Sequence, residues 1–424
     1  MRRFLRKLRQ ATTSLGRHDL WMSARNRAAG QLAAAARCHR RSLGSRVRIV
    51  AVAGTFGKTS TTRAISAVLG LPVPPSDRNL LGSVALRLLA LPPWRRRAAF
   101  EVALGGPGQM AVFADLLRPD LVVVTSIGSE HNRAFGSLDA TQAEKTRIVA
   151  ALGPAGAAVL NRDDPRVWAM AQAAPGRVVS FGFDAGADVR AYAFELDWPH
   201  GIRFRAHLAG RSLAVRAPLL GRVMVYPCLA AIAIAWLEGL SLERAVAALA
   251  GLEPAPARLQ IVPLPNGAWL IRDDFKSAEE TIGAALDLLA EVPGRRIAVL
   301  GSVTDHSGAQ GPIYRRLGER LAGMTTKVVV YGGQAKRYGV GLRAGGSPKE
   351  ALVDAGCEIG AAWRAVQCDL RPGDVVLVKG RTSERLDRIA LALLGRHIRC
   401  TIESCKITEL RCAACPRLET GWKI

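Results

Sequence analysis

The sequence predicts an α/β protein with two sheet-containing domains. Apolar, β-rich runs alternate with helix-like stretches from Val47 onward, which is typical of a parallel, doubly wound sheet. The chain has 424 residues, more than a single hydrophobic core usually supports. A proline-rich stretch from Leu252 to Arg258 interrupts the alternation and marks a domain boundary.

We therefore expect four segments. They are a basic helical segment at residues 1–46, a central domain with a mostly parallel sheet at residues 47–256, a smaller α/β domain at residues 257–397, and a cysteine-rich tail at residues 398–424.

The first segment is strongly basic. Residues 1–48 hold 13 Lys and Arg against one acid, Asp19, in a chain of net charge +24. Apolar residues recur there in a roughly helical rhythm: Phe4, Leu5, Leu8, Leu15, Leu20, Trp21 and Met22. Three interpretations stay open: a solvated or packed helix, contact with an anionic membrane surface, and binding to nucleic acid or another polyanion. No aromatic-glycine RNA-binding signature favours the last of these.

The composition predicts a cytoplasmic protein, with peripheral contact at the inner membrane surface as an open option. No apolar run reaches the roughly 18 residues of a membrane span, and no long apolar stretch follows the charged start. Eight cysteines in a chain of this length, four of them crowded near the end, suggest a reducing compartment and a metal rather than a disulfide framework.

The central domain begins with a strand that leads directly into a glycine loop. Its expected strands are Val47 to Ala53, Ala99 to Ala103, Leu121 to Ser126, Ala157 to Asn161 and Val178 to Gly182. Between residues 188 and 217 shorter alternating runs predict antiparallel strands added to this sheet, and residues 227–240 predict a closing helix.

The glycine loop predicts a phosphate-binding site. Its glycines let backbone N–H groups converge on an anion, Lys58 adds a point charge, and the Thr59 hydroxyl can hold Mg²⁺. The expected nucleotide-binding residues are Gly54, Thr55, Gly57, Lys58, Thr59 and Ser60. We interpret the central domain as P-loop NTPase-like and the reaction as driven by ATP. The alternative is a glycine turn with an incidental lysine.

The spacing of this loop, Gly-x-x-Gly-Lys-Thr, is shorter than the general pattern and resembles the nucleotide loop of the Mur ligase family, which are ATP-dependent ligases that form amide bonds. Further similar segments follow in the family's order: Thr125 to His131, Phe135 to Ser137, Glu144-Lys145, Leu160 to Pro165, Arg258, Asp273-Asp274, Val299 to Gly301 and Val376 to Gly380. The resemblance covers about residues 47 to 397.

The resemblance implies a metal site beside the loop. Thr59, Glu101 and His131 match positions that hold Mg²⁺ in the family, and Lys145 matches a lysine that many Mur ligases carbamylate to bridge a second Mg²⁺. The alternatives are an ordinary surface or ion-paired Glu101 and an unmodified Lys145 on an exposed helix face, paired with Asp139 or Glu144.

The second domain is expected to be smaller and Rossmann-like. Its strands are predicted at 269–272, 296–301, 327–331 and 374–379, with helices that begin at Glu279, Ile313 and Glu384. By resemblance, Arg258 reaches the ATP phosphates, and Asp273 or Asp274 with Lys276 forms the substrate and nucleotide loop. The resemblance also implies that the domains close over ATP and exclude water. Lys276 and Lys379 could each bind a carboxylate or phosphate, and a solvated lysine is the alternative for both.

The chain departs from the family at several positions: Phe56, Ser129, Glu130, Gly221 to Pro227 and Ser302. No domain for a uridine-diphosphate sugar precedes the loop in this sequence, so the expected substrate is not the usual muramyl nucleotide. In this respect the chain resembles poly-γ-glutamate and folylpolyglutamate synthases. An acidic amino acid or polyglutamate-like acyl donor would suit the basic chain.

The tail holds four cysteines within sixteen residues: Cys400, Cys405, Cys412 and Cys415. Four thiolates can form a tetrahedral Zn²⁺ site, so a structural zinc is our prediction. An iron–sulfur cluster and unligated or redox-active cysteines are the alternatives. The tail is also a candidate docking element for a protein partner.

The sequence thus predicts an ATP-dependent carboxylate–amine ligase that forms an acyl phosphate and releases ADP and phosphate. Lys58, Lys145 and Arg258 are its expected catalytic residues, and its partners are small or oligomeric carboxylate and amine substrates. Two alternatives stay open: a ligase subunit that uses ammonia from an amidotransferase, and a catalytically degenerate nucleotide-binding scaffold.

Overall fold

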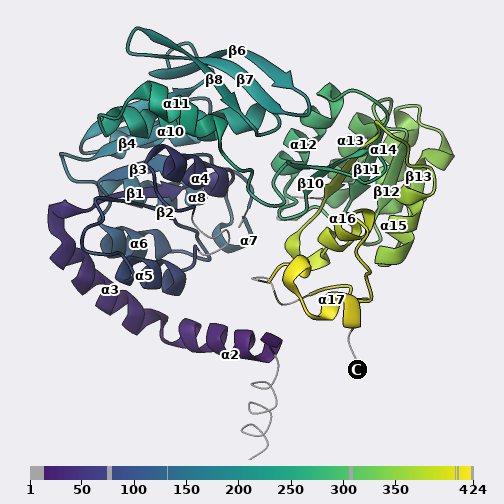
Figure 1. Ribbon diagram of the computed structural model, residues 1–424, viewed down its shortest axis with the longest axis horizontal. Helices are drawn as coiled ribbons and strands as arrows, with labels where there is room; N and C mark the ends of the chain where they lie inside the picture. Colours follow the sequence, from purple (N-terminus) through teal and green to yellow (C-terminus); the bar gives the residue numbers. More distant parts are fainter. Residues whose placement is uncertain are drawn as a thin grey trace, which may run out of the picture. The chain divides into compact units, whose positions relative to one another are not determined.

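The computed structural model describes residues 14–73, 79–130, 132–304, 309–405, 407 and 410–421. Contacts divide the chain into two compact units (Figure 1). Unit 1 contains Met1–Glu195, Arg203–Ala217 and Met224–Leu252, and unit 2 contains Leu196–Ile202, Pro218–Val223 and Glu253–Ile424. Each unit is built on its own sheet.

The sheet of unit 1 has eight strands in the order β2-β1-β3-β4-β5-β6-β7-β8. Its strands are β1 (Arg48–Ala53), β2 (Arg97–Glu101), β3 (Leu121–Val124), β4 (Ala157–Asn161), β5 (Arg177–Gly182), β6 (Val189–Asp197), β7 (Gly201–Leu208) and β8 (Arg211–Ala217). The strands from β2 to β6 pair in parallel, as expected for a doubly wound sheet. β1 is buried on both faces because helices cover both sides of the sheet.

The last three strands form the predicted antiparallel addition. β7 and β8 are joined by Ala209 and Gly210 alone, and both residues have positive φ, 50° and 76°. Two such residues make the tight turn that suits the twist of a hairpin. A connection this short can join only antiparallel strands, so this prediction is confirmed.

The described helices of unit 1 are α2 (Ser14–Arg27), α3 (Ala29–Leu43), α4 (Lys58–Val68), α5 (Leu81–Leu89), α6 (Gln109–Leu117), α7 (Asn132–Phe135), α8 (Leu138–Ala150), α9 (Pro165–Trp168), α10 (Val225–Leu237) and α11 (Leu242–Ala250). Helices lie on both faces of the sheet, whereas α2 extends away from it (Figure 1). Figure 1 shows α10 and α11 on one side and α3, α5 and α6 on the other. Side-chain caps start several of them: the Ser137 hydroxyl accepts from the Ala140 N–H at the start of α8. None of the described helices combines the length and the apolar character needed to cross a bilayer.

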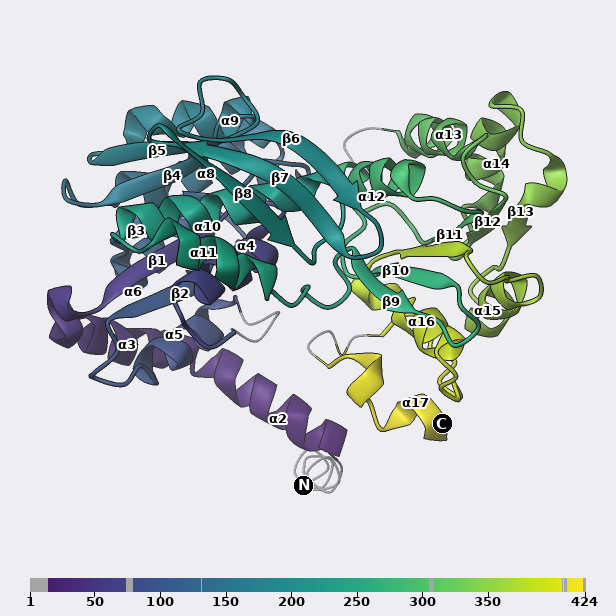
Figure 2. The same cartoon turned by 45° about the horizontal axis from the view of Figure 1, so that its top comes forward.

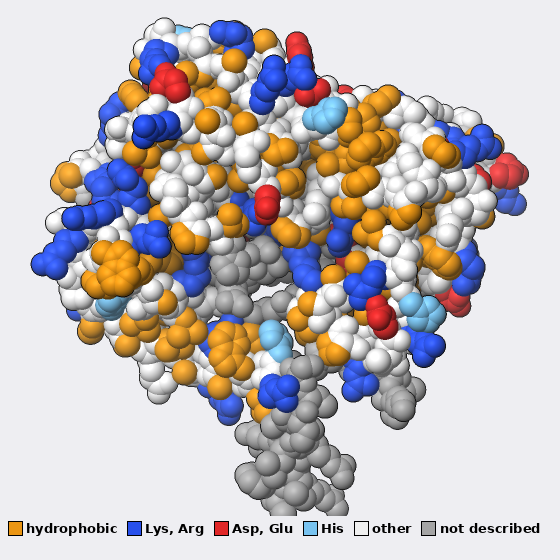
Figure 3. Space-filling model, viewed as in Figure 1, with side chains coloured by type: hydrophobic (Ala, Val, Ile, Leu, Met, Phe, Trp, Pro, Cys, Tyr) orange, Lys and Arg blue, Asp and Glu red, His pale blue; other side chains and the backbone are white. Residues whose placement is uncertain are grey.

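The basic segment is partly integrated into unit 1. On α3 the buried Arg40 donates from Nε to the Leu117 carbonyl at 2.7 Å and from Nη2 to the Arg118 carbonyl at 2.8 Å. It also pairs with Asp120 at 3.2 Å, and burial lowers the pKa of Arg40. α3 is therefore a packed helix, whereas Trp21 on α2 is 48% exposed. The apolar residues Phe4, Leu5 and Leu8 lie outside the described residues. Figure 3 shows Lys and Arg spread widely over the viewed face, in keeping with the net charge of +24.

The sheet of unit 2 has six strands in the order β13-β12-β11-β14-β10-β9. They are β9 (Gln260–Pro263), β10 (Trp269–Asp273), β11 (Arg296–Leu300), β12 (Lys327–Val330), β13 (Leu352–Asp354) and β14 (Val375–Lys379). Only β9 pairs antiparallel, with β10. The helices are α12 (Glu279–Glu291), α13 (Gln310–Leu321), α14 (Ala335–Ala344), α15 (Ile359–Gln367), α16 (Asp387–Leu393) and α17 (Arg417–Thr420). The predicted α/β architecture is confirmed.

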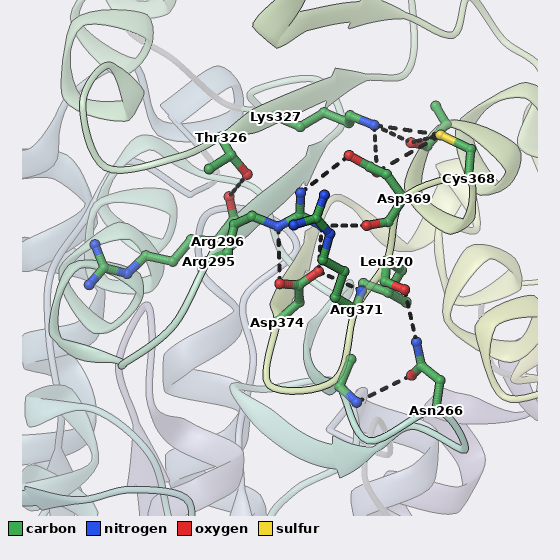
Figure 4. Close-up of polar contacts among 12 residues, drawn as sticks. Asn266, Arg295, Arg296, Thr326, Lys327, Cys368, Asp369, Leu370, Arg371 and Asp374 are labelled. Carbon is green, nitrogen blue, oxygen red and sulfur yellow. Dashed lines mark hydrogen bonds and ion pairs between the residues drawn. The ribbon is translucent and has the colours of Figure 1, made fainter.

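An ion-pair network lies beside the amino-terminal ends of β11, β12 and β14 (Figure 4). Arg295 pairs with Asp374 at 2.7 Å and with Asp369 at 3.4 Å, and Lys327 pairs with Asp369 at 2.7 Å. The network holds the start of three parallel strands. The candidate site residues of unit 2 follow the opposite, carboxyl-terminal ends of β10 and β14.

Candidate active site

The glycine loop of unit 1 connects β1 to α4 and packs against the end of β3. Gly54 has a φ of 140°, and a Cβ built there would collide with the Thr125 hydroxyl oxygen. Gly57 has a φ of 80° and is the N-cap of α4, an 11-residue helix. Both positions therefore need glycine. The loop presents its backbone amides at the positive end of α4, which suits an anion.

Residues that follow β3 hold the glycine loop in place through hydrogen bonds. The Thr55 N–H donates to the Ser126 carbonyl at 2.7 Å, and the Phe56 N–H donates to the Ser126 hydroxyl at 2.9 Å. The Thr55 hydroxyl accepts from the Gly128 N–H at 2.9 Å. The structure thus brings the two matched motifs, the loop and the segment after β3, into direct contact.

Lys58 folds back over the loop. Its Nζ donates to the Thr55 carbonyl at 2.8 Å, and the side chain is half-buried. Ser60, another expected nucleotide-binding residue, is buried on α4 with 4% exposure. The ammonium of Lys58 therefore lies at the glycine loop, where a phosphate would be bound.

Thr59 and Glu101 are held together by a hydrogen bond. The Thr59 hydroxyl donates to Glu101 Oε2 at 2.9 Å, and Asn79 Nδ2 donates to the other oxygen, Oε1, at 2.8 Å. The pairing of β1 with β2 sets Val52 opposite Glu101, so the carboxylate arrives beside the loop. Asn79 was missed by the sequence reasoning because no local pattern marks it.

The donors at this point fit a hard cation. A carboxylate and a hydroxyl are ligands that Mg²⁺ accepts, and both belong to buried side chains, Glu101 at the end of β2 and Thr59 at the start of α4. Within the described part of the chain Glu101 forms no ion pair with a basic side chain. The predicted ligand His131 lies outside the described residues.

Lys145 is buried on α8 and has an altered acidity. Its side chain is 2% exposed, and its Nζ lies 3.5 Å from the Thr55 hydroxyl oxygen. Burial, and then repulsion by Lys58, lower the pKa of Lys145 to about 7, although Glu144 acts in the opposite direction. A lysine with this pKa is substantially neutral near pH 7, the form that can react with CO₂ to give a carbamate.

The alternative of an exposed Lys145 is wrong. Asp139, one of its two suggested partners, pairs with Arg166 at 2.8 Å. Glu144, the other, accepts from the Met110 N–H at 2.9 Å and is itself buried. α8 instead directs Lys145 inward, beside Thr55 of the glycine loop.

In unit 2, the two adjacent aspartates after β10 have different surroundings. Asp273 pairs with the buried Lys379 at 2.8 Å and accepts from the Leu259 N–H at 3.3 Å. Lys379 also donates to the Lys276 carbonyl, so it is a structural link and not a solvated lysine.

Asp274 is fully buried. It pairs with Arg272 at 3.0 Å, and burial raises the pKa of Asp274. The neighbouring Asp387 carboxylate raises the pKa further. Asp273, through Lys379, is linked to the Lys276 part of this loop.

Arg258 lies over the ring of Phe275, with its guanidinium carbon 4.1 Å from the ring centre. Its neighbours Ala257 and Leu259 both have positive φ, 57° and 48°, which few non-glycine residues adopt. Lys276 contacts the same ring, with Nζ 5.7 Å from its centre. The predicted phosphate-binding arginine and the predicted loop lysine thus share one aromatic neighbour.

The four tail cysteines are free and are not gathered into a metal site. Among the described residues, which include all four, no group of three or more His, Cys, Asp or Glu is arranged to hold a metal ion. Cys400 lies against Arg388, with 3.5 Å between Sγ and Nη1, and Cys412 is buried. The geometry therefore gives the zinc prediction no support. Contacts with the rest of the protein hold the segments that carry Cys400 and Cys412.

Comparisons with known proteins show which family the chain resembles. A family model described as "Mur ligase middle domain" matches residues 52–235, and one described as "Mur ligase, glutamate ligase domain" matches residues 257–382. A UDP-N-acetylmuramoyl-tripeptide--D-alanyl-D-alanine ligase of Mycobacterium bovis is 32% identical over 376 residues, covering 82% of this chain and 73% of the relative. The ligase of that name from Escherichia coli is 28% identical over 358 residues, covering 82% and 76%.

Solved structures share the fold. MurF from Acinetobacter baumannii matches with a TM-score of 0.77 and 23% identity over 86% of this chain and 80% of that one. The MurF ligase of Thermotoga maritima in complex with ADP matches with a TM-score of 0.76 and 20% identity, covering 86% and 83%.

Proposed function

The chain belongs to the Mur ligase family of ATP-dependent, amide-bond-forming ligases, and from this premise we propose that it joins a peptide carboxylate to the amine of a D-alanyl-D-alanine-type dipeptide. The observation that carries the proposal is the cluster formed at the glycine loop by Lys58, Thr59, Glu101 and Lys145. Such a cluster supplies cations and oxygen ligands at the place where phosphate transfer needs both.

In the proposed reaction, the donor carboxylate attacks the γ-phosphorus of ATP and gives an acyl phosphate with ADP. The amine then attacks the acyl carbon and phosphate leaves. The loop amides and Lys58 bind the phosphate oxygens and stabilise the charge that develops on them. Arg258, in unit 2, is proposed as a further phosphate-binding cation.

Mg²⁺ would neutralise phosphate oxygens in this reaction. Thr59 and Glu101 would hold it, with His131 as a further predicted ligand. Lys145 fits a role as a second ligand only after carbamylation, because an ammonium cannot bind a cation. Its pKa of about 7 supports that modification, since the amine must be neutral to attack CO₂.

The substrate class rests on the relatives. The M. bovis and E. coli proteins are both named for a muramoyl-tripeptide donor and a D-alanyl-D-alanine amine. An acidic amino acid or polyglutamate-like donor, which the sequence suggested, stays a prediction. An ammonia-using subunit also stays a prediction, as do a protein partner at the tail and contact of the basic segment with a membrane.

A product assay tests the proposal. The purified protein is incubated with ATP, Mg²⁺ and bicarbonate and with one of two substrate sets: UDP-N-acetylmuramoyl-tripeptide with D-alanyl-D-alanine, or glutamate and polyglutamate donors with pooled amino acids. Mass spectrometry should find an amide product with equimolar ADP in the first set. Lys58→Ala should abolish it, whereas the exposed Lys336→Ala should not. An amide in the second set alone would replace the proposed substrate class.

A further inference from the structure

The cysteine-rich tail is folded onto unit 2 although it lies beyond the matched family domains, which end at residue 382. The fully buried Arg388 of α16 donates from Nη1 to the Cys400 carbonyl at 2.8 Å and from Nη2 to the Ile402 carbonyl at 2.6 Å. Figure 2 shows this last part of the chain, in yellow, folded beside α16. The tail is therefore part of the folded unit.

The last two cysteines of the tail lie one turn apart. Cys412 opens the short 3₁₀ turn η6 (Cys412–Ala414), and Cys415 is its C-cap. The Cys415 N–H donates to the Cys412 carbonyl at 3.0 Å and closes the turn. In a 3₁₀ turn residues i and i+3 lie on the same side, with a rise of about 6 Å between them. A disulfide needs Cα atoms about 4.4 to 6.8 Å apart, so the turn places the two cysteines within range of one another.

Contacts on both sides hold this turn. The Cys412 N–H donates to Asp387 Oδ2 at 3.1 Å, and Cys412 packs with Leu418 and Leu391 in a small apolar cluster. The Leu418 N–H donates to the Cys415 carbonyl at 3.0 Å. The separation of the two cysteines is therefore set by the fold of the tail.

The two thiols differ in their access to solvent. Cys412 is 7% exposed, whereas Cys415 is half-buried. Burial, and then the neighbouring Asp387 carboxylate, raise the pKa of the Cys412 thiol. Because the thiolate is the form that attacks a disulfide, Cys415 is the thiol that reacts first with an oxidant from solution. Cys412 then reacts second, with the sulfur of Cys415.

The surroundings of Cys412 can assist this second reaction. Asp387 Oδ2 accepts the Cys412 N–H, while the other oxygen, Oδ1, is buried and has no hydrogen-bond partner in the part of the chain that the structure describes. That oxygen is open to accept a proton. Arg385 and Arg388 act against Asp387 on the pKa of Cys412 and favour its thiolate.

Cys400 and Cys405 are held separately. Cys400 Sγ lies 3.5 Å from Arg388 Nη1, and the Cys405 N–H donates to the Ser383 carbonyl at 2.9 Å. This pair is an internal comparison for the turn that joins Cys412 to Cys415.

We propose that Cys412 and Cys415 form a redox-active dithiol, which small disulfides oxidise reversibly to an intramolecular disulfide. The Cys415 thiolate attacks one sulfur of glutathione disulfide, forms a mixed disulfide and releases one glutathione thiolate. Cys412 then gives its proton to Asp387, its sulfur attacks the Cys415 sulfur, and the second glutathione thiolate leaves. Two protein thiols are oxidised while one glutathione disulfide is reduced to two glutathione molecules. This chemistry is independent of the ligase reaction.

Peptide mapping of the full chain tests the proposal. Reduced protein is equilibrated at increasing ratios of glutathione disulfide to glutathione, free thiols are alkylated at low pH, and the tryptic peptides are analysed by mass spectrometry. Trypsin places Cys400 and Cys405 together in peptide 400–406, and Cys412 and Cys415 together in peptide 412–417. Peptide 412–417 should lose two hydrogen atoms and take up no alkyl group, and a reductant should restore both thiols. Peptide 400–406 should stay unlinked.

Variants test the order of the two thiols. Cys412→Ser should leave Cys415 with one bound glutathione, and Cys415→Ser should leave the buried Cys412 unmodified. Asp387→Asn keeps an acceptor for the Cys412 N–H, and the mixed disulfide at Cys415 should then resolve at least about tenfold more slowly. The matched control is Cys357→Ser, which removes an exposed cysteine elsewhere in unit 2 and should form the disulfide as the wild type does.

A peptide 412–417 that stays a dithiol, or that carries two glutathiones, at the highest ratio would overturn the inference. Equal linkage of peptide 400–406 would overturn it as well, because the turn would then confer no selectivity. Glutathione on Cys412 in Cys415→Ser would refute the order of reaction, and an unchanged rate in Asp387→Asn would remove the carboxylate from the second step. If a variant does not fold, the map of the wild type alone decides whether the disulfide forms. Failure of the proposed function appears separately, as the absence of amide product in the turnover assay.

Discussion

The ammonium nitrogen of Lys145 lies 3.5 Å from the hydroxyl oxygen of Thr55, which ties the buried lysine of α8 to the glycine loop. The Thr55 carbonyl accepts from Lys58 at 2.8 Å, so a single loop residue contacts both lysines. Repulsion between the two cations is one cause of the lowered pKa of Lys145. The phosphate-binding loop and the candidate carbamylation site are therefore physically coupled.

Lys145 should make the stability of the protein depend on pH. Its pKa is about 7 in the folded protein and near 10.5 when unfolded, so between these values the unfolded chain binds more protons. The contribution of Lys145 to the free energy of unfolding should then rise with pH, by up to about 1.4 kcal/mol per unit from pH 7 to 10.

Urea unfolding of the wild type and of Lys145→Met in bicarbonate-free buffer measures this difference. The wild type should gain stability relative to the variant as the pH rises through that window. A difference that is flat in pH would show that Lys145 keeps an ordinary pKa.

Carbamylation of Lys145 should be detectable directly. In ¹³C-bicarbonate the wild type should show a carbamate carbon resonance that Lys145→Arg lacks, and the modified fraction should grow as the pH rises through about 7. Activity of the variant should fall at least about 100-fold, because a ligand for a metal is lost. Full activity of Lys145→Arg would exclude this role.

Thr59 and Glu101 should act together on Mg²⁺. Thr59→Val removes the hydroxyl that donates to Glu101 at 2.9 Å, and Glu101→Gln removes the carboxylate charge. Each change should lower metal affinity by about 10- to 100-fold, seen as a higher Mg²⁺ concentration needed for ADP release. Thr59→Ser keeps the hydroxyl and serves as the control. If Thr59→Val and Thr59→Ser show the same Mg²⁺ dependence, the hydroxyl has no part in metal binding.

Gly54→Ala should weaken nucleotide binding strongly. Its Cβ would meet Thr125 at a backbone φ of 140°, which L side chains rarely adopt, so the loop would have to move. We expect a loss of stability above about 1 kcal/mol and at least a tenfold loss of ADP affinity. Gly106→Ala, where a Cβ would meet nothing within 4 Å, is the matched control. Normal ADP binding by Gly54→Ala would contradict the loop assignment.

Arg40→Ala should destabilise unit 1 by about 3 kcal/mol, because the carbonyls at the end of α6 lose their buried donor. The exposed Arg41→Ala should change the thermal midpoint little. Equal midpoints for the two variants would show that the contacts of Arg40 contribute nothing to the stability of unit 1.

The fold was largely predictable from the sequence, because most strands are long apolar runs buried on both faces. The observed β4 has the predicted bounds, Ala157–Asn161, and β11 ends one residue before the predicted limit. The strands β9 and β13 were missed. Both are short edge strands whose residues are only partly buried, so the sequence carries no buried run there.

The site was predictable only where motifs are local. The loop residues and Glu101 follow from such patterns, but Asn79 carries no signal before its contact with Glu101 is known. Lys145 lies in a polar helix sequence, which gives no indication of its burial. The cysteine spacing predicted a metal. The tail is instead held by Arg388 and Asp387, which bond to the backbone of Cys400 and Cys412, and the spacing of the cysteines gives no indication of these contacts.

We propose that this chain activates a carboxylate as an acyl phosphate at the glycine loop. The most direct measurement is oxygen transfer: a donor labelled with ¹⁸O in its carboxylate is turned over with ATP and amine, and the phosphate is analysed by mass spectrometry. We expect one ¹⁸O atom in each phosphate released together with ADP, and no turnover by Lys58→Ala. Release of AMP, or amide formation with unlabelled phosphate, would contradict it.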